Sequence, residues 1–128
     1  MTVWLSKQTV LAIHDEQLAE HGGAVGVRDE GLLESALARP LNRASYGKPD
    51  IAELAALYAV AIVQNHPFVD GNKRTAYVML ETFLELNGLQ FPVNDTQAVI
   101  AMLSLAAGDT SDDEFIEWVR ANTRIPAN

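Results

Sequence analysis

Residues 66–76 read HPFVDGNKRTA, and this run combines the side chains of a phosphate-handling site with the start of a helix. It contains a histidine, a carboxylate, three turn formers at 70–72 and two adjacent cations. The residues that follow predict a helix ending near Gly88. A helix N-terminus offers unpaired N–H groups and the positive end of the helix dipole, which suit an anion. Cations such as Lys73 and Arg74 are unfavourable there for the helix itself, so a bound polyanion explains them better.

His66 and Asp70 are the candidate chemical groups of this run. His66 precedes Pro67, which disfavours helical geometry at the residue before it. A histidine there can act as a general base, and a structural histidine bonded to a carbonyl is the alternative. Asp70 can hold Mg²⁺ together with nucleotide phosphates, because hard oxygen ligands suit this ion, and a helix N-cap is its alternative. We expect Phe68 to be a buried anchor of the loop.

The next four residues are candidates for phosphate binding. Gly71 allows a positive φ or a close approach of the backbone to a phosphate. Asn72 can cap the helix or donate its side-chain amide to a phosphate oxygen. Lys73 adds a charge, and Arg74 offers a planar fork for phosphate oxygens. A surface pair between this arginine and the preceding carboxylate is the alternative, but such exposed pairs contribute only about 0–1 kcal/mol.

The composition predicts one globular domain over residues 1–128. The absence of cysteine excludes disulfides and thiolate metal sites. A net charge of −8 argues against direct nucleic-acid binding, although six of the nine cations lie between residues 28 and 74, which is consistent with a local anion site. No apolar run approaches the ~18 residues of a membrane span, and the first residues do not resemble a signal peptide. We therefore expect a cytoplasmic protein that does not act at a membrane.

Helical signals dominate the chain and predict an all-α bundle of about six helices. Expected helices run from Ser6 to Gly22, Asp29 to Ala38, Asp50 to Asn65, Asn72 to Asn87, Asn94 or Asp95 to Ala107, and onward from Ser111. The segment from Leu54 to Val63 is apolar nearly all round, so its helix should be central and buried. Only residues 89–93 have an extended character, and Pro92 argues against a regular strand there.

The run at 66–76 resembles the signature of the Fic/Doc family, whose Fic branch reads H-P-F-x-(D/E)-G-N-G-R-x-x-R. The chain departs from it at Lys73, where Fic enzymes have a second glycine, and at Tyr77, where they have the last arginine. The N-K-R form is similar to that of the Doc (death-on-curing) toxins of toxin–antitoxin pairs. Other Doc-like stretches lie at 26–33, 35–40 and 83–88, so the resemblance covers roughly residues 5–120. It implies a compact all-α domain.

The resemblance implies a toxin that phosphorylates a hydroxyl side chain of a translation factor, elongation factor Tu in the family's known case. ATP is then the substrate and Mg²⁺ the metal. His66 is the implied base that activates the hydroxyl, Asp70 the implied metal ligand, and residues 71–74 the implied phosphate contacts. Lys73 removes room for the β- and γ-phosphates at the helix start, which implies a nucleotide turned round to present its γ-phosphoryl. Fic-type AMP transfer and a non-catalytic, antitoxin-binding protein are the alternatives.

The activity of such a toxin should be inhibited by another protein. The inhibitory S/T-x-x-x-E-G/N motif that many Fic proteins carry does not occur in the sequence. The resemblance therefore implies a cognate antitoxin that covers the groove beside the active site with an apolar or acidic segment.

Three further groups of residues have open assignments. The segment at 41–49 has loop character and lies where Fic proteins carry a flap that aligns the target, so it is either a target contact or a simple connection. Its candidate contacts are Arg43, Tyr46 and Lys48. We expect His14 and His21 at the surface or at a helix end. Arg28 and Arg39 are either solvated arginines or part of the anion site.

Overall fold

The computed structural model describes residues 1–127, which contain six α-helices. They are α1 (Lys7–His21), α2 (Glu30–Ala44), α3 (Ile51–Asn65), α4 (Asn72–Leu86), α5 (Asp95–Ala107) and α6 (Asp112–Asn122). Over this range, two isolated bridges, Val27 with Phe68 and Gln90 with Arg124, are the only strand-like pairings. The predicted all-α bundle of six helices is confirmed.

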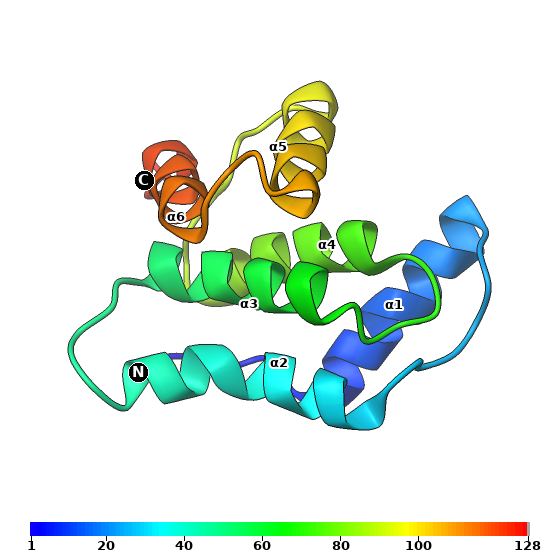
Figure 1. Cartoon of the computed structure of the whole chain (residues 1–128). Helices are drawn as coiled ribbons and strands as arrows, with labels where there is room; N and C mark the ends of the chain where they lie inside the picture. Colours follow the sequence, from blue (N-terminus) through cyan, green and yellow to red (C-terminus); the bar gives the residue numbers. More distant parts are fainter. Residues whose placement is uncertain (128) are drawn as a thin grey trace.

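Helix α3 lies at the centre of the bundle (Figure 1). It packs against α2, α4, α5 and α6, and every residue from Leu54 to Ile62 is buried. A helix that is apolar all round is stable in water only when neighbours cover every face, and this one is covered. The predicted central position of this helix is thus confirmed. None of the helices formed by residues 1–127 is both long and apolar enough to cross a membrane.

Most of the helices begin at a residue whose side chain caps the first turn. Five helices begin after a side chain that accepts a hydrogen bond from the backbone N–H three residues on, which satisfies one of the free donors of the first turn. These N-caps are Ser6, Asp29, Asp50, Asn94 and Ser111. The remaining helix, α4, begins at Gly71 with no side-chain cap, and this exception lies in the candidate site.

Helix α2 is longer than predicted. It continues through Pro40 to Ala44, so the expected end at Ala38 is wrong, and the expected loop begins at residue 45 instead of residue 41. Proline removes one backbone donor and normally interrupts a helix. Here Pro40 is buried, and the last turn is held against α3 because Arg43 donates from Nε to Glu53 Oε2 at 2.7 Å. Tertiary contacts therefore carry the helix past the proline.

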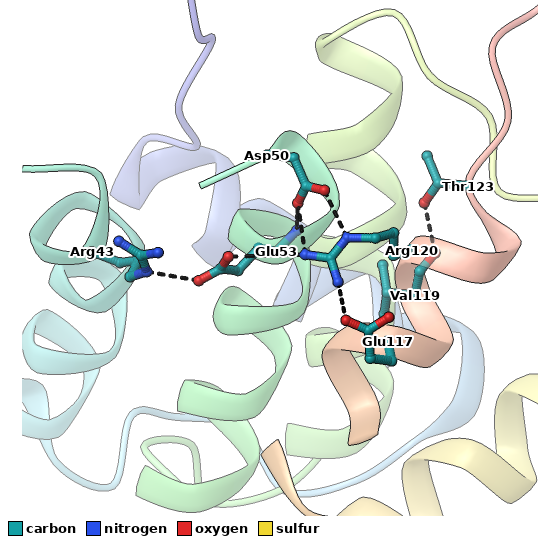
Figure 2. A network of polar contacts seen from close by, with 7 residues as sticks. All are labelled: Arg43, Asp50, Glu53, Glu117, Val119, Arg120 and Thr123. Carbon is teal, nitrogen blue, oxygen red and sulfur yellow. Dashed lines mark hydrogen bonds and ion pairs between the residues drawn. The ribbon is translucent and has the colours of Figure 1, made fainter. Parts of the chain in front are cut away.

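A polar network joins α2, α3 and α6 at the first turn of α3 (Figure 2). Arg120 donates from Nε to Asp50 Oδ2 at 2.7 Å and also pairs with Glu117. The hydrogen bond from Arg120 lowers the pKa of the Asp50 carboxyl, so this carboxyl is ionised at neutral pH. Arg43 joins the same cluster through Glu53. Because α3 spans Ile51–Asn65, the network braces the end of α3 that lies away from His66.

Candidate active site

His66 ends α3 in a left-handed conformation, with φ 50° and ψ 54°. It is the only non-glycine residue with a positive φ in the range 1–127. Such a conformation costs on the order of 1–3 kcal/mol and persists only where surrounding contacts hold it. Its N–H donates to the Ile62 carbonyl at 2.9 Å, and Pro67 prevents the helix from continuing. The residue is exposed, so the imidazole is presented at the end of a buried helix.

Arg28 holds the backbone of His66. Its guanidinium donates from Nε to the His66 carbonyl at 2.7 Å and from Nη2 to the Asn65 carbonyl at 3.0 Å. Both carbonyls belong to the last turn of α3, where no intrahelical donor is available. The Arg28 N–H also donates to the Pro67 carbonyl at 2.7 Å. Arg28 is therefore neither simply solvated nor free for an anion, because its side chain stabilises the turn at His66.

Asn72 and Phe68 fix the loop from inside the protein. Phe68 is fully buried, as the sequence predicted. Asn72 is 5% exposed, and its Oδ1 accepts from the Phe68 N–H while its Nδ2 donates to the Phe68 carbonyl, both at 3.0 Å. The side chain therefore does not cap α4, and its two polar atoms both bond to the Phe68 backbone. The backbone N–H of Asn72 remains free to face an anion.

The Asp70 carboxylate is exposed but already oriented. Its Oδ2 accepts from the Ala24 N–H at 3.2 Å, and its Oδ1 accepts from the Gly71 N–H at 2.8 Å. These bonds, with the nearby charge of Arg74, hold the pKa of the Asp70 carboxyl below its usual range. In the described chain it forms no ion pair with Arg74 and does not cap α4. The structural alternative for Asp70, a helix N-cap, is therefore absent, and its remaining lone pairs face solvent.

Helix α4 begins with free donors. Gly71 adopts φ 77°, so the predicted positive φ is confirmed. A Cβ at this position would lie 3.4 Å from Leu18 Cδ2, which shows how closely α1 approaches the turn. The N–H groups of residues 72–74 have no acceptor within residues 1–127, and the next one, of Thr75, donates to the Gly71 carbonyl. Free N–H groups at a helix start form a ready site for an anion.

Lys73 and Arg74 flank these donors on the surface. Both are exposed, and neither takes part in an ion pair anywhere in the described range. Arg74 donates from Nη2 to the Gly22 carbonyl at 3.2 Å, which leaves most of its fork free. The surface alternative for Arg74, a pair with Asp70, is absent. Two unneutralised cations therefore stand at the positive end of the α4 dipole.

A groove of about 510 Å³ extends from these cations between α1, α4 and α5. Its apolar lining includes Val78, Val99 and Leu103, and the last two are more than half exposed. The buried Tyr77 hydroxyl on its wall has no hydrogen-bond partner within residues 1–127. The groove therefore combines exposed apolar side chains on α5 with two exposed cations at the start of α4.

His14 was misassigned from the sequence. It is 3% exposed, its ring stacks on Phe68 with centroids 3.8 Å apart, and its Nε2 lies 2.8 Å from the Asp70 carbonyl oxygen. Helical spacing carried a usable signal, because position 14 shares a face with the buried Val10 and Leu18. By contrast, His21 is the exposed last residue of α1, as predicted.

The segment after α2 offers fewer target contacts than predicted. Arg43 lies on α2, where its guanidinium is occupied by Glu53 and by the Tyr46 carbonyl. Tyr46 and Lys48 are exposed and remain candidates. Arg39 is likewise occupied, because it pairs with Asp112 at 2.9 Å.

The donor set fits a metal ion that is shared with a nucleotide. Across residues 1–127 no three acidic or histidine side chains gather to form a metal site. Asp70 is a single oriented, ionised carboxylate beside free anion-binding donors. Mg²⁺ is commonly held by one or two carboxylates together with substrate phosphates and water, so this arrangement suits it.

A family model described as "Fic/DOC family" matches residues 4–84, which include the whole candidate site. The chain belongs to this family. It is 37% identical over 87 residues to "Protein kinase doc" of Escherichia phage P1, covering 67% of this chain and 69% of that protein. It is 41% identical over 93 residues to "Toxin Doc" of Mycolicibacterium smegmatis, covering 70% of this chain and 68% of that protein. The resemblance to the Doc branch is therefore confirmed.

We predict that Arg28→Gln loosens the turn at His66. Loss of two charge-assisted hydrogen bonds should lower the free energy of unfolding by about 1–3 kcal/mol and speed amide exchange at His66 and Phe68. Arg124→Gln is the matched control, because Arg124 is also exposed and also donates to two backbone carbonyls, those of Ala121 and Thr123. Equal exchange rates at His66 and Phe68 in both variants would contradict the role given to Arg28.

Proposed function

We propose that this protein is a toxin of a toxin–antitoxin pair that transfers the γ-phosphoryl group of ATP to a hydroxyl side chain of a translation factor. The observation that supports this proposal is the placement of four exposed groups on one fixed loop and helix start. These groups are His66, Asp70, Lys73 and Arg74. The names of the two relatives, one a kinase and one a toxin, support the same activity.

His66 is the proposed general base. In the reaction, the target hydroxyl gives its proton to the imidazole as its oxygen bonds to the γ-phosphorus. The bond from that phosphorus to the β–γ bridging oxygen breaks, so ADP leaves and the target carries a phosphate ester. A positioned base contributes roughly 10²–10⁴-fold to such a rate. The fixed turn at His66 supports this role because the ring extends from backbone that Arg28 and Pro67 constrain.

The start of α4 is the proposed phosphate site. The N–H groups of residues 72–74 and the side chains of Lys73 and Arg74 can neutralise charge that spreads over the phosphate oxygens during transfer. Phosphoryl transfer depends mainly on positioning and electrostatic stabilisation, so a preset group of donors is the main requirement. Asp70 would hold Mg²⁺, which would offset negative charge on the nucleotide phosphates.

Lys73 is the residue that we propose selects the reaction. It occupies the position of the second glycine of Fic enzymes, which generally transfer AMP. Its side chain fills space at the helix start, so the nucleotide would bind in the opposite sense with its γ-phosphoryl toward His66. An elongation factor Tu-like protein is the proposed target, and the exposed Tyr46 and Lys48 are candidate contacts to it.

The groove between α1, α4 and α5 is the proposed binding surface for a cognate antitoxin. An apolar segment would cover Val99 and Leu103, and an acidic residue at its end would pair with Lys73 or Arg74. Bound there, the segment would cover Lys73 and Arg74, which are the proposed contacts to the phosphates of ATP. The antitoxin would then inhibit by competing with the nucleotide.

We predict that His66→Ala abolishes growth arrest and phosphoryl transfer while the thermal unfolding temperature stays nearly unchanged. The side chain is exposed and contributes no core packing. Transfer should fall by roughly 10²–10⁴-fold. His21→Ala is the matched control, since it removes an exposed histidine from the end of α1. A His66→Ala protein that remains fully toxic would rule out its role as the base.

The central test uses ATP labelled at either the α or the γ phosphate, with a cell extract that contains candidate targets. Wild type should transfer γ label and no α label. Lys73→Gly should lower γ transfer by at least about tenfold, because a charge that stabilises the reacting phosphate is lost. Any AMP transfer gained should be weak, since Tyr77 replaces the arginine that would hold the far phosphates. Transfer of α label by wild type, unchanged in Lys73→Gly, would instead support AMP transfer.

The antitoxin surface is tested with two substitutions on α5. Leu103→Glu places a charge in the groove and should weaken antitoxin binding by about tenfold or more while toxicity persists. Ile100→Glu is the matched control, because Ile100 is equally exposed on α5 but does not line the groove. Binding is measured by titration of the purified protein with the antitoxin encoded beside it. Equal affinities for both variants would place the antitoxin elsewhere.

A further inference from the structure

The buried side chain of His14 contacts the backbone carbonyl of Asp70, the proposed metal ligand. The side chain is 3% exposed within α1, and its Nε2 lies 2.8 Å from the Asp70 carbonyl oxygen. A carbonyl oxygen can only accept a hydrogen bond, so the Nε2 atom must carry the proton. The parallel Phe68 ring, 11° from coplanar, fixes the plane of the imidazole. His14 is therefore a donor with a defined direction.

This bond orients the peptide between Asp70 and Gly71. A trans peptide is planar, with its C=O and N–H pointing in opposite directions. When His14 holds the carbonyl toward α1, the Gly71 N–H must point the other way, where it donates to Asp70 Oδ1 at 2.8 Å. The direction of the carboxylate is thus coupled to a buried histidine far from it in the sequence.

The packing around the turn leaves little freedom for another arrangement. Leu18 and His14 lie against Gly71, at 3.4 Å and 3.7 Å from where its Cβ would be. Gly23 also approaches Asp70 so closely that a Cβ there would lie 2.8 Å from Oδ2. The turn is confined between α1 and the segment that follows it, and the His14 bond selects the orientation of the peptide within that space.

We propose that His14 is a positioning residue, which holds the Asp70–Gly71 peptide so that the carboxylate and the first donors of α4 face the same metal–phosphate group. The proposal rests on the proposed function, because it takes Asp70 as the ligand of Mg²⁺. It goes beyond that function by assigning metal affinity to a residue that contacts neither metal nor nucleotide. If His14 served only in core packing, its aromatic ring would matter and its hydrogen-bond donor would not.

Two variants separate the ring from the hydrogen bond. His14→Phe keeps a flat ring against Phe68 and removes the donor, whereas His14→Gln keeps a donor near the Nε2 position and removes the ring. In His14→Phe, the Mg²⁺ concentration for half-maximal phosphoryl transfer at saturating ATP should rise about tenfold, the lower end of what loss of a ligand-orienting bond costs. In His14→Gln it should stay near the wild-type value. Equal shifts in both variants, or none in His14→Phe, would overturn the proposal.

A second measurement does not depend on activity, and its first part uses the wild-type protein alone. Nitrogen chemical shifts of His14 in the nucleotide-free wild-type protein should show a protonated Nε2, and the Gly71 amide signal should shift in His14→Phe but far less in His14→Gln. A proton on Nδ1 with a bare Nε2 would overturn the proposal even if His14→Phe failed to fold. Absence of phosphoryl transfer from the wild type would refute the proposed function alone, since the Nε2 result still decides whether His14 orients the turn.

Discussion

Two left-handed residues bracket the loop between α3 and α4, and the geometry of the candidate site depends on them. His66 has φ 50° and Gly71 has φ 77°. They turn the chain out of one helix and into the next, so the connection needs only residues 66–71. Glycine adopts this conformation without strain, whereas histidine requires support from its surroundings. The guanidinium of Arg28 gives that support at the His66 carbonyl.

The buried polar side chains of the site form hydrogen bonds to the loop backbone, and the exposed side chains remain available to a ligand. Asn72 is bonded on both sides to the Phe68 backbone, and His14 is bonded to the Asp70 carbonyl. Helix α3, covered by four neighbours, carries one end of the loop on a rigid element. Lys73 and Arg74 therefore extend from a fixed backbone. The proposed phosphoryl transfer would require this, because such transfer depends mainly on positioning.

The helices and the loop were predictable from sequence because their signals are local. Asp50 and Ser111 cap helices within three residues of themselves, and the motif is one continuous run. Three features depend on distant contacts and were not predicted. Helix α2 continues beyond Pro40, and the hydrogen bond from Arg43 to Glu53 on α3 stabilises its last turn. The burial of His14 and the inward side chain of Asn72 likewise depend on how α1 and the loop pack together.

We propose that Asp70 and the first turn of α4 bind the metal–phosphate group together. Paramagnetic broadening by Mn²⁺ with a non-hydrolysable ATP analogue tests this most directly, because it locates the metal without requiring turnover. We expect the amide signals of Asp70, Gly71 and Lys73 to broaden first, and we expect Asp70→Asn to remove the effect. Broadening centred on Asp112 and Asp113 at the start of α6, or broadening that Asp70→Asn leaves unchanged, would contradict it.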